Sequence, residues 1–331
     1  MKNISNYPAI LNRKFNTSYA KVRAEVFVML NQPIKPMLLQ PLPPSGIKEG
    51  WKSSIKWDGF RISIHYDHGN VRAYTRHGTE VTERFPELQK ISLSAKTAIL
   101  DGECIAFDVT QATDQTPKIW WDDAMARFHT KKASAIKQIS KSLKAHFPIW
   151  DVLWINGQSV MSKTFTERRE ILQAILPPSD TISITPLYDD GTQLFLNIKQ
   201  QGLEGIVQYN SDAPYYLDSR PQDVITKIKA YQFAICDVVS IRKNRFGWGL
   251  QMNDKYVGLL EFPPQRALIQ QFHSIKKNLV RSETKDWIYL EPLISCRIKF
   301  QCFTKNGNLR SPTLVEFFPT STVSKENVLA N

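Results

Sequence analysis

Cysteine and long apolar runs are both scarce in this chain of 331 residues. Its four cysteines form no C-x-x-C pair and no Cys/His spacing typical of a zinc site. We therefore expect free, buried thiols in a reducing compartment, and neither a disulfide scaffold nor a zinc site. No apolar stretch approaches the roughly 20 residues of a membrane-spanning helix, and the N-terminus lacks the pattern of a secretory signal. These absences predict a cytoplasmic protein that does not use a membrane.

The chain has an excess of positive charge: it contains 43 Lys and Arg residues but 31 Asp and Glu residues, which gives a formal net charge of +12. With 42% hydrophobic and 22% charged residues, this is an ordinary globular chain long enough for two domains. That composition excludes a disordered tail and a collagen-like fibre. The excess of positive charge favours a polyanionic partner such as nucleic acid, with an anionic membrane surface as the alternative.

The pattern of residues divides the chain into four parts. Residues 1–35 are predicted to form an N-terminal arm with a short helix near residues 20–30, and residues 320–331 a flexible tail. Between them we expect two domains, over residues 36–231 and 232–319.

The larger domain has the pattern of an α+β fold. Short alternating runs, typical of antiparallel strands, cover residues 61–66, 71–76, 98–107 and 147–155. Thr164 and Glu167 form a T-x-x-E capping box, which predicts a helix that ends at Pro177.

The smaller domain is rich in predicted strands and turns, with one helix-like segment near residues 266–276. Residues 232–331 contain fourteen Lys and Arg residues against eight Asp and Glu residues. Positive charge is therefore denser in this part, as expected of a domain that contacts phosphates.

The segment Lys56-Trp57-Asp58-Gly59-Phe60-Arg61 is the most distinctive feature of the sequence. An Asp-Gly pair is common in tight turns, so a surface hairpin is one interpretation. In the predicted strand that follows, Arg61, Ser63 and His65 share a face opposite to the core, which would let cations line that side.

Further candidate residues follow downstream. Asp101-Gly102-Glu103 and Glu204-Gly205 place carboxylates in or beside predicted strands, and Lys227 and Lys229 share one strand face. Each is explained most simply as structural when taken alone. Together they supply a nucleophile, cations for phosphate oxygens, and carboxylates for ribose hydroxyls or a metal ion.

The order and spacing of these motifs resemble the covalent nucleotidyltransferase superfamily, and above all the ATP-dependent DNA ligases of the bacterial end-joining type. The family motif K-x-D-G-x-R matches Lys56, Asp58, Gly59 and Arg61. Further matches are Thr75-Arg76-His77-Gly78, Asp101-Gly102-Glu103, the segment from Trp150 to Gly157, Glu204-Gly205, Lys227-x-Lys229, and the L-R-x-P element that contains Arg310.

The resemblance implies a fold, cofactors and roles for individual residues. The fold would be a nucleotidyltransferase domain of antiparallel sheets with flanking helices, followed by a C-terminal OB-fold β-barrel. The cofactors would be ATP and Mg²⁺, with Mn²⁺ as a substitute. Lys56 would be the AMP-lysine nucleophile, supported by Asp58 and Gly59. The remaining roles would be nucleotide binding by Arg61, Arg76, Glu103, Trp150, Lys227 and Lys229, metal binding by Glu204, and DNA binding by Arg310.

The physical chemistry of the reaction agrees with this set of residues. A lysine attacks phosphorus only as the neutral amine, whereas an ordinary lysine has a pKa of about 10.4, so nearby cations are needed to favour the neutral form. By resemblance, AMP would pass from ATP to Lys56, then to a DNA 5′-phosphate, and a 3′-hydroxyl would displace it.

The implied partners are nicked or broken duplex DNA in DNA repair, with end-bridging or polymerase proteins as further partners. The protein would act as a monomer and would be associated with the nucleoid in a bacterium.

The sequence departs from the family pattern at four places. Ser54 replaces a usual Glu, Tyr209 a frequent Lys, and Ile225 a common Trp, and no R-x-D-K motif follows the L-R-x-P element. We therefore expect slower self-adenylylation, or the use of another cation.

The sequence is also compatible with two other functions. One is an RNA ligase or a capping-type nucleotidyltransferase, and the other is a non-catalytic DNA-binding scaffold.

Overall fold

The computed structural model describes residues 30, 32–111, 119–177 and 179–318. The chain divides into two compact units. The first comprises the chain up to Leu194 together with Val207–Lys227, and the second comprises Phe195–Ile206 and the chain from Ile228 onward. The N-terminal arm and its helix lie almost entirely outside the described residues, as does the predicted tail at residues 320–331.

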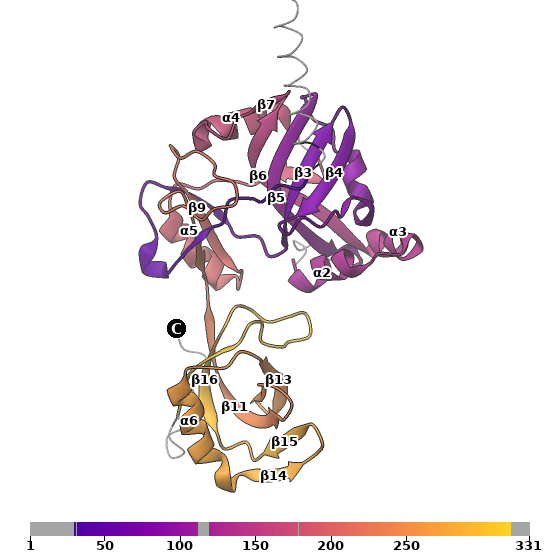
Figure 1. Ribbon diagram of the computed structural model, residues 1–331. Helices are drawn as coiled ribbons and strands as arrows, with labels where there is room; N and C mark the ends of the chain where they lie inside the picture. The colour runs from indigo at the N-terminus through magenta and orange to yellow at the C-terminus, as the bar shows by residue number, and fades with distance from the viewer. Residues whose placement is uncertain (1–29, 31, 112–118, 178, 319–331) are drawn as a thin grey trace, which may run out of the picture. The chain divides into compact units, whose positions relative to one another are not determined.

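A six-stranded sheet forms the centre of the first unit (Figure 1). Its strand order is β4-β3-β5-β6-β7, with β8 beside β6. The strands are β3 Phe60–Asp67, β4 Asn70–Thr75, β5 Thr97–Asp108, β6 Leu143–Ile155, β7 Gln158–Ser159 and β8 Ile182–Ile184. All neighbours are antiparallel except β8, which runs parallel to β6. The strands predicted over residues 61–66, 71–76, 98–107 and 147–155 are therefore confirmed, and β3 and β4 form a hairpin that turns after Asp67.

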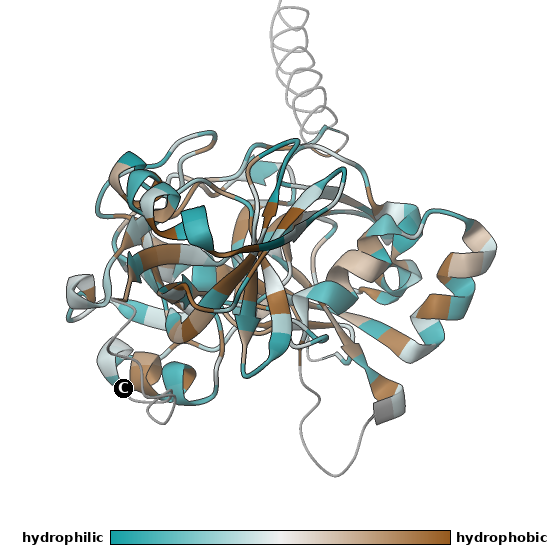
Figure 2. Cartoon of the chain, turned by 90° about the horizontal axis from the view of Figure 1, so that it is seen from below, coloured by the Kyte–Doolittle hydropathy of each residue, from teal (hydrophilic) through white to brown (hydrophobic). Residues whose placement is uncertain are grey.

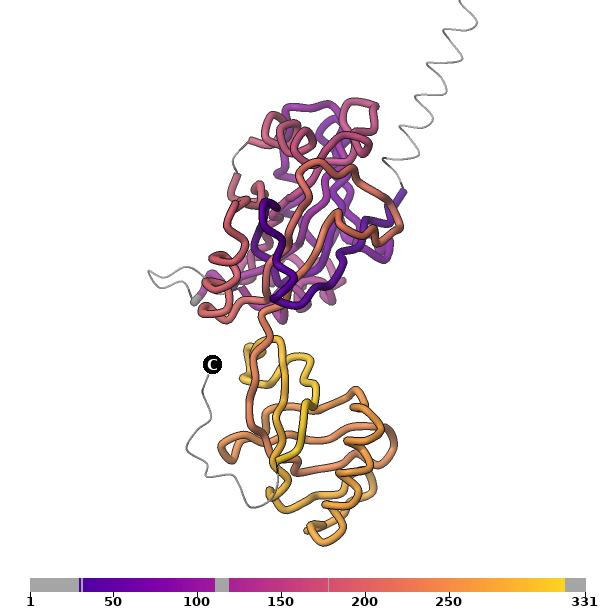
Figure 3. Tube along the Cα trace, turned by 90° about the vertical axis from the view of Figure 1, so that its left-hand side faces the viewer, coloured from indigo at the N-terminus to yellow at the C-terminus, as the bar shows by residue number. Residues whose placement is uncertain are grey.

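A smaller sheet of four strands has the order β1-β10-β9-β2. These strands are β1 Gln40–Leu42, β2 Lys52–Ile55, β9 Gly205–Tyr209 and β10 Ile225–Lys229. In the first unit, residues 35–38 run beside residues 215–219, joined by backbone hydrogen bonds such as Leu38 N–H to the Ser219 carbonyl at 2.8 Å (Figure 3).

Apolar cores cover both faces of the larger sheet. Figure 2 marks hydrophobic residues along the strands in brown. Ile62 and Ile64 of β3 point into one core, as the alternation predicts. The opposite face was predicted to carry cations, and this is wrong for Ser63 and His65, which are only 6% and 2% exposed. A second core covers them, and a ring nitrogen of His65 lies 3.2 Å from the carbonyl of Leu30.

Helices flank the larger sheet (Figure 1). Helix α4, Phe165–Ile175, packs on β6 and begins with the predicted capping box: the Glu167 N–H donates to the Thr164 hydroxyl, and the Thr164 N–H donates to the Glu167 carboxylate. Helix α2, Trp121–His129, packs on β5 and was not predicted. The other helices before β9 in the described residues are α3 Ala133–Ser142 and α5 Gly191–Gln200, and α5 continues from the first unit into the second. The 3₁₀ turns are η1 Pro44–Gly46, η2 Thr82–Arg84, η3 Pro86–Lys90 and η4 Val109–Gln111.

The second unit is built on a seven-stranded antiparallel sheet. The long strand β11 pairs with β12, β15 and β16, so the sheet bends around an apolar core that includes Trp248, Phe272 and Phe300. The strands are β11 Gln232–Arg242, β12 Trp248–Met252, β13 Lys255–Leu260, β14 Val280–Glu283, β15 Trp287–Leu290, β16 Ser295–Phe300 and β17 Thr313–Phe317. The predicted helix is α6, Arg266–Ile275, followed by the 3₁₀ turn η5, Lys276–Asn278.

The four cysteines are free, and Cys104, Cys236 and Cys296 are buried. Burial raises the pKa of the Cys236 thiol to about 12. The prediction of buried free thiols is therefore confirmed for these three, whereas Cys302 is half-buried. None of the helices in the described residues combines the length and apolarity needed to cross a membrane.

Candidate active site

A cavity of about 460 Å³ opens in the first unit, lined by residues of both sheets. It brings together six residues that the sequence had suggested for catalysis or nucleotide binding: Lys56, Arg61, Arg76, Glu103, Trp150 and Lys227. They come from the loop before β3, from strands β3, β5, β6 and β10, and from the turn after β4. Residues far apart in the sequence therefore share one cavity.

Lys56 lies in the loop that joins β2 to β3. These strands belong to different sheets, so the hairpin interpretation of this segment is wrong. Asp58 lies in the same loop and is half-buried. At Gly59, a Cβ atom would meet the Cys104 carbonyl oxygen at 2.0 Å. Only glycine lets the loop lie this close to β5, which explains the residue type after Asp58.

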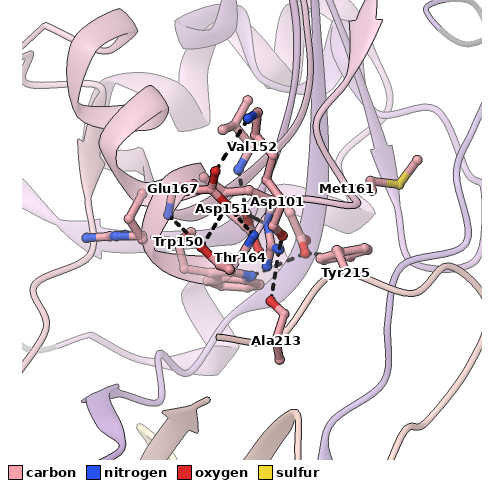
Figure 4. Close-up of polar contacts among 12 residues, drawn as sticks. Asp101, Trp150, Asp151, Val152, Met161, Thr164, Glu167, Ala213 and Tyr215 are labelled. Carbon is pink, nitrogen blue, oxygen red and sulfur yellow. Dashed lines mark hydrogen bonds and ion pairs between the residues drawn. The ribbon is translucent and has the colours of Figure 1, made fainter. Parts of the chain in front are cut away.

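A buried ion pair forms one wall of the cavity. Arg61 donates from Nε and Nη2 to the two carboxylate oxygens of Asp101, at 2.9 and 2.5 Å. Nη1 of Arg61 donates to the Met37 carbonyl. The Tyr215 hydroxyl donates to Asp101 at 2.8 Å, and both residues are labelled in Figure 4. Burial alone would lower the pKa of Arg61, but the negative charge of Asp101 outweighs it and raises the pKa. Arg61 therefore keeps its positive charge in the cavity.

Trp150 is fixed by the same carboxylate. Its indole N–H donates to Asp101 at 3.2 Å (Figure 4). The Arg61 guanidinium lies 5.4 Å from the ring centroid. The ring also lines the cavity. A fixed aromatic surface in a cavity with cations suits a nucleobase that carries phosphates.

Several residues of the cavity wall were not found from the sequence, among them Met125, Phe128 and Arg220. Met125 and Phe128 come from α2, and Arg220 comes from the segment between β9 and β10. The acidic residues Asp122 and Asp123 in the first turn of α2 were the available signal for that helix. Arg220 adds a cation to the cavity and lies outside the sequence motifs.

Glu204 and Lys229 belong to the second unit, where they lie against each other. Nζ of Lys229 is 3.3 Å from a carboxylate oxygen of Glu204. Gly205 has a φ of +148°, and a Cβ atom there would lie 2.1 Å from the Ile228 carbonyl oxygen, so glycine permits this close approach of β9 to β10. Arg310 is half-buried, and its N–H donates to the Cys302 carbonyl at 2.9 Å.

Two departures from the family pattern contact each other. The hydroxyl oxygens of Ser54 and Tyr209 are 3.2 Å apart, and Tyr209 also stacks on Phe165 with ring centroids 4.5 Å apart. Burial raises the pKa of Tyr209, so the phenol stays neutral. The third departure, Ile225, lines the cavity together with Tyr209. This part of the wall is therefore uncharged.

A lysine in a cavity with cations, a carboxylate and an indole, within an α+β unit of two sheets, defines a protein of the nucleotidyltransferase class. The profile described as "ATP dependent DNA ligase domain" matches residues 36–229. The chain therefore belongs to the ATP-dependent DNA ligase family.

The comparisons also show similar individual proteins. The SPbeta prophage-derived DNA ligase-like protein LigB of Bacillus subtilis (strain 168) is 30% identical over 285 residues, which are 85% of this chain and 97% of LigB. The multifunctional non-homologous end joining protein LigD of Mycolicibacterium smegmatis (strain ATCC 700084 / mc(2)155) is 27% identical over 50% of this chain, but the match spans 20% of LigD.

A solved structure of a Lig E DNA ligase has a TM-score of 0.57 at 17% identity, and the match covers 86% of this chain and 98% of that one. At that identity the likeness shows the fold. The predicted fold class, an adenylation domain followed by an OB-fold, is confirmed.

Proposed function

We propose that this chain seals nicks in duplex DNA with ATP, and that Lys56 is the residue that becomes adenylylated. The observation that carries this proposal is the shared cavity, in which Lys56 lies with Arg61, Arg76 and Lys227. Phosphoryl transfer depends mainly on position and on neutralisation of charge, and these residues supply both.

In the first step, Nζ of Lys56 attacks the α-phosphorus of ATP. A bond forms between nitrogen and phosphorus, the bond to the bridging oxygen breaks, and pyrophosphate leaves with the electron pair. The proton of the lysine passes to solvent. Arg61, Arg76 and Lys227 stabilise the phosphate oxygens, Trp150 stacks on the adenine, and Glu103 holds the ribose hydroxyls.

In the second step, an oxygen of a DNA 5′-phosphate attacks the phosphorus of the bound AMP. The phosphorus–nitrogen bond breaks, and the Lys56 amine takes up a proton. In the third step, the 3′-hydroxyl across the nick attacks the 5′-phosphate and loses its proton, and AMP leaves with the electron pair.

A divalent cation, Mg²⁺ or Mn²⁺, belongs to the proposed chemistry. Mg²⁺ is usually bound through one or two carboxylates and the phosphates of the substrate. The described residues contain no cluster of three or more His, Cys, Asp and Glu side chains arranged for a metal. We propose that the carboxylate of Glu204 would bind this ion. The ion would neutralise phosphate charge.

We further propose that residues 36–231 and 232–319 are the two functional domains, and that the second contacts the DNA backbone. Its excess of basic residues supports this role, to which we assign Arg310. The LigD relatives are named as end joining repair proteins, which supports a role in DNA repair. We propose that the protein acts in the cytoplasm as a monomer, and that other chains deliver broken ends.

The test is incubation of the chain with α-labelled ATP and with nicked duplex DNA. We expect a label bound to the protein, its removal by added pyrophosphate, and sealing of the nick. Lys56→Ala should abolish all three. Lys52→Ala is the matched control, because this lysine lies four residues earlier, in β2, and pairs with Asp189. It should retain full labelling.

The same assay separates the alternatives. Labelling by GTP in place of ATP, or sealing of RNA in place of DNA, would favour an RNA ligase or a capping-type enzyme. Binding of nicked DNA with no label on the protein would favour a non-catalytic scaffold.

A further inference from the structure

Gln301 of the second unit holds the side chain of Lys229. Its amide oxygen accepts a hydrogen bond from Nζ of Lys229 at 2.8 Å, shorter than the 3.3 Å between Nζ and Glu204. Gln301 directly follows the last residue of β16 and is only 2% exposed. None of the motifs in the sequence analysis assigns it a role.

The position of Gln301 is fixed by its surroundings. Its N–H donates to the Arg310 carbonyl at 3.0 Å, and the neighbouring Phe300 is buried, with its ring centroid 4.9 Å from that of Phe303. An acceptor on such a segment restricts the lysine that binds it. Lysine otherwise has a long, flexible stem and loses much rotamer entropy when it is held in place.

The chemistry of the acceptor matters as much as its position. Glu204 is a charged acceptor, so Lys229 placed on Glu204 alone would cancel both charges. The Gln301 amide is neutral, and it fixes the ammonium group while leaving its charge available to a phosphate. The second unit thus offers Lys229 a neutral anchor beside a charged one.

The other end of the same amide has no partner. Among the described residues, Nε2 of Gln301 is a buried nitrogen atom with no hydrogen bond. An unpaired buried donor costs free energy, so an apolar side chain of similar shape would be favoured here on stability alone. The glutamine is therefore explained by what its oxygen does and not by a contribution to stability.

We propose that Gln301 is a positioning residue that sets the place of the Lys229 ammonium group for phosphate contact during adenylylation. This inference rests on the proposed function and on the nucleotide-binding role that the resemblance to ATP-dependent DNA ligases implies for Lys229. Gln301 acts through Lys229 and does not itself touch ATP.

The experiment measures the adenylylation rate against ATP concentration for the full chain, its Gln301→Met, Gln301→Leu and Lys229→Met variants, and the double variant Gln301→Met/Lys229→Met. Both apolar side chains remove the acceptor and the unpaired donor together. We expect roughly tenfold lower kcat in the Gln301 variants, with the KM for ATP within about twofold of the parent value. The melting temperature should be unchanged or raised. Gln271→Met is the matched control, since this glutamine of α6 is exposed, and it should behave as the parent.

The double variant separates positioning of Lys229 from a purely structural role, because it shows whether the effect of Gln301→Met on kcat depends on Lys229. If Gln301 acts through Lys229, then Gln301→Met should have no further effect when Lys229 is already Met. An unchanged kcat in the Gln301 variants, additive losses in the double variant, or a fall in melting temperature that accounts for the lost rate would each overturn the proposal. A parent chain that forms no adenylate would instead overturn the proposed function, so the two failures are distinguishable.

Discussion

At the scale of single residues, Asp101 organises much of the cavity wall. This carboxylate is fully buried and accepts a hydrogen bond from Arg61. It also accepts hydrogen bonds from Trp150 and Tyr215 (Figure 4). Two of these three side chains line the cavity. Asp101 therefore acts through the residues it orients, although the sequence suggested it only as a member of the D-G-E motif.

Replacement of this carboxylate should damage both stability and nucleotide binding. Asp101→Asn leaves the Arg61 charge buried without its partner, which we expect to cost about 3–5 kcal/mol in the free energy of unfolding. Urea denaturation measures the loss, and ATP titration of the folded fraction should show weaker binding. The control is Asp218→Asn, because Asp218 and its partner Lys35 are exposed. A fully stable Asp101→Asn variant would contradict this account of the ion pair.

Gly59 is a second residue whose replacement is predictable. In Gly59→Ala, the new Cβ would meet the Cys104 carbonyl oxygen at 2.0 Å, and backbone atoms cannot give way cheaply. We expect the loop that carries Lys56 to shift, with at least about a hundredfold loss of labelling by ATP. Gly69→Ala is the control: nothing lies within 4 Å of its Cβ position, and only its positive φ disfavours alanine. Its cost should be about 1 kcal/mol in stability with labelling retained.

At the scale of elements, helix α4 depends on its N-terminal cap. The capping box of Thr164 and Glu167 satisfies backbone N–H groups that have no partner within the helix. Buried Arg168 and Arg169 of the same helix reach the carboxylate of Asp151 and the carbonyl of Thr185. A well-ordered first turn of α4 therefore also holds Arg168 and Arg169 in place for these two contacts.

The cap gives a prediction of modest size. Thr164→Ala should lower the free energy of unfolding by about 1 kcal/mol, measured by urea denaturation. Gln173→Ala, at an exposed position of the same helix, should not destabilise the protein, because alanine has the higher helix propensity. Equal losses in the two variants would show that the cap contributes nothing specific.

The ion pair between Glu87 of η3 and Arg127 of α2 joins these two elements, and it predicts that the stability of the protein depends on pH. Burial alone would raise the pKa of Glu87, but hydrogen bonds and charge from Arg127 outweigh it and lower the pKa below 4.5. The pair therefore stabilises the fold fully above about pH 4.5, and this contribution is lost as the pH falls through the lowered pKa of the folded state.

Glu87→Gln should accordingly cost about 3 kcal/mol at pH 7, and its difference from the parent should shrink as the pH falls below 4.5. Denaturation at several pH values measures the difference. A constant difference down to pH 3 would contradict the assigned cause.

At the scale of the whole molecule, the net charge of +12 should dominate DNA binding. Each phosphate neutralised by Lys or Arg releases a counterion, so we expect affinity for nicked duplex to fall by more than about tenfold between roughly 50 and 200 mM salt. Fluorescence anisotropy measures this slope. The rate of Lys56 labelling without DNA should change far less, because the cavity charges are partly buried and poorly screened. Equal salt dependence of the two would argue against a separate DNA-binding surface.

Local pattern alone predicted the strands β3 to β6, helix α4 and a second part rich in strands, because strand alternation and capping act over a few residues. The OB-fold and the candidate nucleophile were implied by the resemblance of the motifs to those of ATP-dependent DNA ligases. Only tertiary structure decided that Ser63 and His65 are buried, that α2 supplies a wall of the cavity, that Ser54 meets Tyr209, and that Gln301 anchors Lys229. These outcomes depend on which surfaces pack together and on how buried polar groups find partners across long stretches of chain, and neither leaves a periodic signal in the sequence.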